Sequence, residues 1–178
     1  MQKVTPETND IRIYQKLGRV DAKSLEAVDQ LLLILPARPT KADFGKLPQG
    51  AKIQAVYRKH EAGSTPACVT RLANKRQTLV VTGTLATDAG TFDQLTLGRK
   101  LVAAATSEKA GSLGICAVGF SDADQANVVS NVLAAALAAA FAMPEYKSKA
   151  TPARIRNVRL IGLADKLDTA RVAAEAKG

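Results

Sequence analysis

Hydrophobic and polar residues along the chain predict a series of short strands. Residues 11–14 alternate between apolar and polar, which is typical of a strand exposed on one face. Residues 29–36 (DQLLLILP) form a continuous apolar run that ends at a proline, as expected for a strand buried on both faces. Residues 78–82, 112–120 and 155–163 predict three further strands, and residues 68–72 predict a short element of undecided type.

Helical spacing and capping residues predict three helices in the second half of the chain. Thr91 is a candidate N-cap, with Gln94 three positions on as in a capping box, and the helix runs to about residue 108. Ser121 begins a second helix that reaches about residue 142, before Pro144. Asp168 begins a third helix, which reaches the last residue.

The first half is less regular. Residues 36–50 hold three prolines and two glycines and predict a loop. For residues 53–57 the pattern leaves a helical turn and a strand both open.

The alternation of strands and helices from residue 78 onward predicts an α/β domain with a mixed, largely parallel sheet flanked by helices. A chain of 178 residues suits a single domain. We expect a flexible N-terminus over residues 1–10, the domain over residues 11–167, and the start of a further helix over residues 168–178.

Neither the N-terminus nor the longest apolar run of the chain predicts contact with a membrane. The N-terminus lacks the apolar segment of a signal peptide, and the longest apolar run, residues 128–143, is shorter than the ~20 residues of a spanning helix. Cys68 and Cys116 lie in apolar surroundings and are interpreted as buried thiols, with a disulfide between them as the alternative. These features predict a cytoplasmic protein.

The formal net charge is +9, which favours contact with polyanions or acidic surfaces. The densest basic group consists of five residues: Arg58, Lys59, Arg71, Lys75 and Arg76. The group is either an ordinary solvated surface or a contact for the nucleic-acid backbone. Few aromatic residues are interleaved with it, so we expect non-specific, salt-dependent binding at most.

Catalytic patterns are missing from the sequence. His60, the one histidine, lies in a charged, turn-rich stretch and matches no nucleophile–base motif. Asp122 and Asp124 are explained by helix capping, and the glycines match no phosphate-binding signature. Two cysteines and one histidine also exclude a zinc site with four Cys/His ligands. We therefore predict no catalytic, cofactor-binding or metal-ligating residue.

Two stretches resemble a known family. Residues 92–105 (FDQLTLGRKLVAAA) resemble a helix in the N-terminal domain of a bacterial branch of the leucyl (cytosol) aminopeptidases. Residues 134–149 (AAALAAAFAMPEYKSK) are similar to the stretch where family members end a long helix and continue with a Tyr/Phe-Lys-Ser motif. Residues 155–163 and the helix after Asp168 are similar to the approach to the catalytic domain. The resemblance covers about residues 68–178.

This resemblance implies a macro-domain-like fold and a non-catalytic role. The family's C-terminal domain holds two divalent metals, zinc or manganese, and its N-T-D-A-E-G-R-L signature is absent here. The implied partners are a C-terminal catalytic domain beyond Gly178 and further copies in a hexamer, and some bacterial members also bind DNA. The macro-domain loop that grips ADP-ribose has no match in this chain.

Three hypotheses follow. The leading one is an accessory, oligomer-forming domain of a leucyl-aminopeptidase-like metallopeptidase that removes N-terminal amino acids from peptides. The alternative is a basic binding module for nucleic acid or another polyanion. The third is a small enzyme whose site matches no known motif. A reading frame that continues past Gly178 would favour the first.

Overall fold

The computed structural model describes residues 11–61, 63–108, 111–140 and 155–177, which form one α/β domain. Its six-stranded sheet has the order β1-β6-β5-β2-β4-β3. The first five strands of this order are parallel to one another, and β3, at the edge, pairs antiparallel with β4. The strands are β1 (Arg12–Leu17), β2 (Gln30–Pro36), β3 (Cys68–Arg71), β4 (Leu79–Leu85), β5 (Ser112–Ala117) and β6 (Asn157–Leu163). The predicted fold class, a mixed and largely parallel sheet flanked by helices, is confirmed.

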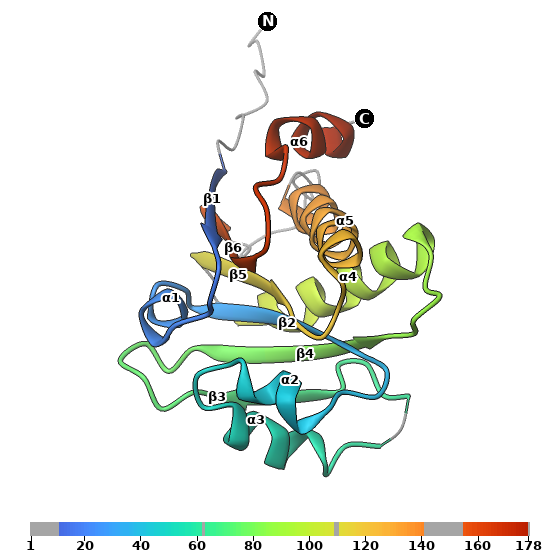
Figure 1. Cartoon of the computed structure of the whole chain (residues 1–178). Helices are drawn as coiled ribbons and strands as arrows, with labels where there is room; N and C mark the ends of the chain where they lie inside the picture. Colours follow the sequence, from blue (N-terminus) through green and yellow to red (C-terminus); the bar gives the residue numbers. More distant parts are fainter. Residues whose placement is uncertain (1–10, 62, 109–110, 141–154, 178) are drawn as a thin grey trace, which may run out of the picture.

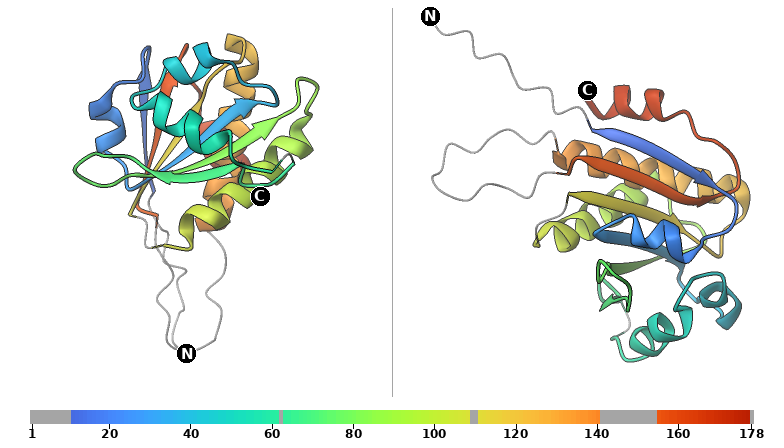
Figure 2. Two further views of the ribbon diagram at one scale, coloured as in Figure 1. Left: turned by 90° about the horizontal axis from the view of Figure 1, so that it is seen from below. Right: turned by 90° about the vertical axis from the view of Figure 1, so that its left-hand side faces the viewer.

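Helices cover both faces of this sheet (Figures 1 and 2). Leu101 and Leu133 pack in the core on one face, whereas Leu25, Phe44 and Ile53 pack in the core on the other. The helices of the first face are α4 (Thr91–Thr106), α5 (Asp122–Ala140) and α6 (Thr169–Lys177). Those of the second face are α1 (Ala22–Glu26), α2 (Lys41–Gly45) and α3 (Gly50–Tyr57).

The apolar run of β2 is explained by its central position between β4 and β5. Side chains of successive strand residues point to opposite faces, and both faces are covered here. Leu32 and Ile34 join the core under α4 and α5, and Leu31, Leu33 and Leu35 join the core under α1–α3. A strand in this position needs an apolar side chain at every residue.

Small residues allow α4 and α5 to pack closely. A Cβ atom added at Gly98 of α4 would lie 2.9 Å from the Cβ of Ala135 and 3.2 Å from the Cα of Val132, both on α5. The alanine-rich sequence of α5 therefore serves close helix packing over the sheet. This confirms the prediction that the apolar run is a buried helix.

Two of the three predicted helix caps are confirmed. The Ser121 hydroxyl accepts a hydrogen bond of 3.2 Å from the Asp124 N–H, and the Asp168 carboxylate accepts one of 3.1 Å from the Arg171 N–H. The cap of α4 was placed one residue too late, because Gly90 is the N-cap. The Asp93 carboxylate accepts from the Gly90 N–H at 3.3 Å, so Asp93 takes the place assigned to Gln94.

The predicted loop over residues 36–50 is wrong, because it contains α2 and the start of α3. Thr40 and Asp43 cap α2 reciprocally: each side chain accepts a hydrogen bond from the other's backbone N–H, at 2.8 and 3.3 Å. Helix α3 settles the open choice for residues 53–57. Helix α1 was not predicted; Asp21 caps it by accepting from the Ser24 N–H at 2.7 Å.

Some predictions fall outside the described residues. These are the flexible N-terminus over residues 1–10 and the end of the alanine-rich helix near residue 142, with Pro144 after it. The predicted final helix is described up to Lys177.

Candidate functional site

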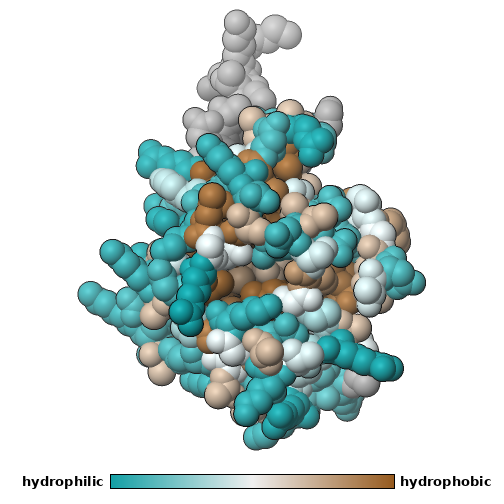
Figure 3. Space-filling view, viewed as in Figure 1, coloured by the Kyte–Doolittle hydropathy of each residue, from teal (hydrophilic) through white to brown (hydrophobic). Residues whose placement is uncertain are grey.

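A pocket of about 550 Å³ opens where β1, β5 and β6 end at their carboxyl ends. In open α/β sheets, ligands bind at this edge, and small-molecule pockets commonly span 300–1,000 Å³. Figure 3 shows apolar residues in a hollow near the middle of the molecule, bordered by hydrophilic ones. The walls include Val20, Val118, Phe120 and Leu163.

Glycines shape the rim of this pocket. Gly119, after β5, has a φ of +87°, and Gly162, in β6, has a φ of +79°. An added Cβ would lie 2.9 Å from Pro36 at the first position and 2.7 Å from Val20 at the second. Both the backbone conformation and the close approach therefore require glycine.

Gln125 of α5 joins two of the strand ends that form the pocket. Its side-chain amide donates to the Ala117 carbonyl at 2.8 Å and to the Gly162 carbonyl at 3.0 Å. Its side-chain oxygen accepts from the Ala164 N–H at 3.0 Å. Both amide hydrogens and the oxygen of Gln125 therefore have partners within the domain. The side chain holds β5, β6 and α5 in place and so fixes the shape of the pocket.

The lining of this pocket combines apolar walls with a few charged side chains. Its charged side chains are Arg19, Lys46 and Asp122, and it includes no serine, cysteine or histidine. His60 lies elsewhere, after α3, where its ring is 4.3 Å from the ring of Tyr57 and its Nδ1 contacts the Tyr57 carbonyl. No nucleophile–base pair forms in this pocket.

Acidic residues do not converge either. Among the described residues, no group of three or more His, Cys, Asp or Glu side chains is placed to hold a metal ion. Asp124 is occupied at the start of α5, where its carboxylate also accepts from the Ser121 hydroxyl at 2.8 Å.

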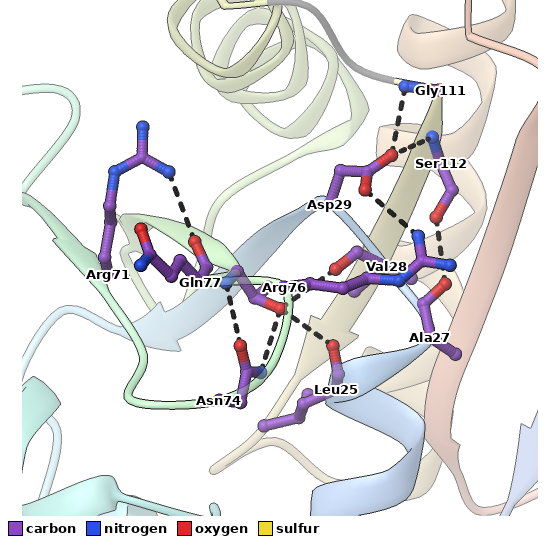
Figure 4. A network of polar contacts seen from close by, with 11 residues as sticks. Leu25, Ala27, Val28, Asp29, Arg71, Asn74, Arg76, Gln77, Gly111 and Ser112 are labelled. Atoms are coloured by element: carbon purple, nitrogen blue, oxygen red, sulfur yellow. Dashed lines mark hydrogen bonds and ion pairs between the residues drawn. The ribbon is translucent and has the colours of Figure 1, made fainter.

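The predicted basic group is divided by the fold. Arg76 lies in the turn between β3 and β4, where its guanidinium donates to the Asp29 carboxylate at 3.0 Å (Figure 4). The other carboxylate oxygen accepts from the backbone N–H groups of Gly111 and Ser112, at 3.2 and 3.0 Å. Arg76 therefore belongs to a network that joins the amino ends of β2, β4 and β5.

Arg71, at the end of β3, is also engaged. One nitrogen of its guanidinium donates to the Gln77 carbonyl at 3.2 Å, and another pairs with Glu108. Two of the five basic residues thus have acidic partners within the domain. Their charge is less available to an external polyanion than the sequence indicated.

The other three members, Arg58, Lys59 and Lys75, are exposed. The N-cap of α3, Gln49, exchanges hydrogen bonds with the backbone of Ala73, near Lys75. Arg58 and Lys59 follow the opposite end of this helix, whose eight residues span about 12 Å. The structure therefore separates them from Lys75.

The two cysteines are buried free thiols, as predicted, and form no disulfide. Burial raises the pKa of Cys116 to about 12, and burial also raises the pKa of Cys68. A thiolate is the reactive form of cysteine, so neither side chain is prepared to act as a nucleophile.

Sequence reasoning missed the pocket. Its members lie in four separate segments of the chain, and none of these segments carries a recognised binding motif. The sequence signal that could have indicated it is a glycine near the end of two predicted strands, Gly119 in residues 112–120 and Gly162 in residues 155–163.

A search of the described residues for a long apolar helix finds none that would cross a membrane.

Comparisons with known proteins give a match in structure alone. No family model matches the sequence, and no curated protein matches it. A solved structure of a mutant tomato leucine aminopeptidase superimposes with a TM-score of 0.69 and 15% sequence identity, covering 97% of this chain. The chain spans 36% of the length of that protein. The likeness shows that this domain shares its fold with part of a leucine aminopeptidase.

Proposed function

We propose that this chain is the non-catalytic N-terminal domain of a leucyl-aminopeptidase-like metallopeptidase. The observation that carries the proposal is the likeness to tomato leucine aminopeptidase, which covers 97% of this chain and 36% of that one. The chain spans about a third of that enzyme, and in this proposal the chemistry belongs to the remainder. The sequence resemblance over residues 68–178 points to the N-terminal part.

The chemistry of the described residues supports a non-catalytic role. Hydrolysis with two metals needs several carboxylates around one site. Asp122 and Asp124 occupy the first turn of α5, where a negative charge stabilises the helix dipole. In this proposal the two divalent ions, zinc or manganese, bind to the catalytic domain. The domain described here contributes to the architecture of a cytoplasmic hexamer.

The proposal predicts the mass of the native protein. An antibody raised against this chain is used to blot an extract of the cells that produce it, and the detected band is then sequenced by mass spectrometry. We expect a polypeptide well above the 18.7 kDa of this chain. Its additional peptides should carry the N-T-D-A-E-G-R-L signature of the catalytic domain.

Two outcomes contradict this prediction. One is a band at 18.7 kDa alone, which would mean that the domain acts by itself. The other is a larger polypeptide whose additional peptides belong to another class of protein. Recombinant chain added to the same extract controls for proteolysis during preparation.

The second candidate function is a polyanion-binding module, and the net charge of +9 favours it. The predicted group supports it less well, because Arg71 and Arg76 pair with Glu108 and Asp29. A role of this kind needs cations that have no partner within the domain.

A further inference from the structure

One face of the sheet is basic and is left open at β1 and β6. Along β1, Ile13 packs into the core under α4–α6. Strand alternation therefore directs Arg12, Tyr14 and Lys16 to the opposite face. Tyr14 is the register partner of Arg159 on β6, which shares that face. We call these four residues, Arg12, Tyr14, Lys16 and Arg159, the β1–β6 face.

Two helices of that side, α2 and α3, lie away from this surface. Figure 1 shows α2 and α3 beside β3 and β4, at the opposite end of the strand order from β1. Their apolar residues belong to the core that includes β2 and β4. Tyr14 keeps 41% of its surface exposed, and Arg12 and Lys16 are exposed as well. A large aromatic ring thus lies open to solvent between two cations of the same strand.

Arg159 is held against this ring. Its guanidinium carbon lies 4.6 Å from the centroid of the Tyr14 ring, within the range of a cation–π contact. Its Nε is buried and has no hydrogen-bond partner, and no acidic side chain of the described residues pairs with it. A partly buried cation without a counter-ion is costly, and an incoming anion would remove that cost.

Lys16, by contrast, has an acidic partner, Asp21. Asp21 lies 2.7 Å from the Lys16 ammonium, and the hydrogen bond from Lys16 is the largest cause that holds the pKa of Asp21 below its ordinary value. Asp21 is therefore ionised and neutralises Lys16. Arg12 and Arg159 are left as the two cations that an external ligand can engage.

These side chains match the chemistry of one ligand. A guanidinium offers a planar set of donors that fits a phosphate group. An exposed aromatic ring offers a stacking surface for an unpaired base, and proteins that bind single strands combine such rings with basic residues. An acidic peptide would use the arginines but not the ring. A duplex keeps its bases stacked and unavailable to the ring.

We propose that the β1–β6 face binds single-stranded nucleic acid, with Arg12 and Arg159 on phosphates and Tyr14 stacked against a base. This goes beyond the role of an accessory domain and does not depend on it. The face provides no side chain arranged to read base edges, so binding is independent of sequence. The site differs from the basic group Arg58, Lys59, Arg71, Lys75 and Arg76.

The test is a titration of a fluorescently labelled oligothymidylate with the full chain, followed by anisotropy at low and moderate salt. We expect a dissociation constant in the ~10⁻⁴–10⁻⁶ M range of non-specific binding, which weakens as salt rises. The double variant Arg12→Gln/Arg159→Gln should lower the affinity by about tenfold or more. It should also make the salt slope of the binding constant shallower by about 1.4, because two phosphate contacts are lost.

A matched control removes the same charge elsewhere. Arg58→Gln/Lys59→Gln lies after α3, so it should change the affinity less than about threefold. Tyr14→Leu should lower the affinity by about fivefold or more through the loss of stacking, whereas Tyr14→Phe keeps the ring and the affinity. Circular dichroism and a thermal melt of each variant confirm that it is folded.

Several results would overturn the proposal. One is an equal loss in the Arg58/Lys59 variant, which would make binding a property of total charge. Another is an unchanged affinity in folded Tyr14→Leu. A third is tighter binding of a duplex of the same length, and a fourth is equal competition by a polyglutamate peptide at matched charge.

Discussion

At the scale of single residues, Asp29 joins the starts of neighbouring strands of the sheet. It precedes β2, and its carboxylate accepts hydrogen bonds from the start of β5 and from Arg76 in the turn before β4 (Figure 4). Nearby, the buried Thr78 hydroxyl donates to a carbonyl at the end of α1. These contacts fix where three neighbouring strands begin.

Removal of the Asp29 carboxylate should destabilise the fold. In Asp29→Ala the N–H groups of Gly111 and Ser112 lose their acceptor, which costs about 1–3 kcal/mol of unfolding free energy. Urea denaturation measures the difference.

The control for this prediction is Arg76→Gln, which removes only an exposed ion pair and should cost less than about 1 kcal/mol. Equal losses in the two variants would show that the ion pair, and not the backbone contacts, is what matters at Asp29.

Little of this could be predicted from the sequence. Asp29 and Arg76 are 47 residues apart, and the pattern around each is that of an ordinary polar residue at the end of a strand. The contact between Tyr14 and Arg159 joins residues that are 145 positions apart in the chain. Contacts of this kind depend on strand order, which hydrophobic periodicity does not encode.

At the scale of elements, the sequence was most informative where the pattern was long. The strands β2, β4, β5 and β6, and the starts of α5 and α6, follow from apolar runs and capping residues. The elements that escaped prediction are α1 and α2, of five residues each. One helical turn shows no periodicity, and the prolines and glycines around α2 are equally common in loops.

The packing of α5 gives a prediction at this scale. Leu133 and Leu137 are four residues apart on one face of the helix, and they are 0% and 2% exposed. Leu133→Ala and Leu137→Ala should each lower the free energy of unfolding by about 2–5 kcal/mol, because each leaves a cavity against the sheet.

Leu17, at the end of β1, provides the matched control. It is 49% exposed, so Leu17→Ala should cost much less than either core change. Losses below about 0.5 kcal/mol at both core positions in denaturant melts would mean that this face of α5 does not pack as described.

At the scale of the whole molecule, the fold class was predictable but the strand order was not. Alternating strands and helices indicated a parallel sheet, yet nothing in the sequence placed β1 at the edge beside β6, the last strand. That pairing places the first and last strands of the domain side by side and creates the β1–β6 face. The pocket at the carboxyl ends of β1, β5 and β6 depends on the same order.

The availability of the charged side chains also depends on the whole fold. Density along the sequence singled out a group around residues 58–76, two of whose members pair with acidic residues that are distant in the chain. Nothing in the sequence connects Arg12 with Arg159, which lies 147 residues further along the chain. The fold brings them to one surface, where no described acidic residue pairs with Arg159.

The central claim is that this domain carries no peptidase chemistry, and hydrolysis of an aminoacyl reporter by the purified chain tests it most directly. With manganese or zinc added, we predict no turnover above that of buffer, because no described carboxylate cluster holds the metals. Turnover that stays with the chain through purification and disappears in Asp122→Asn/Asp124→Asn would contradict the claim.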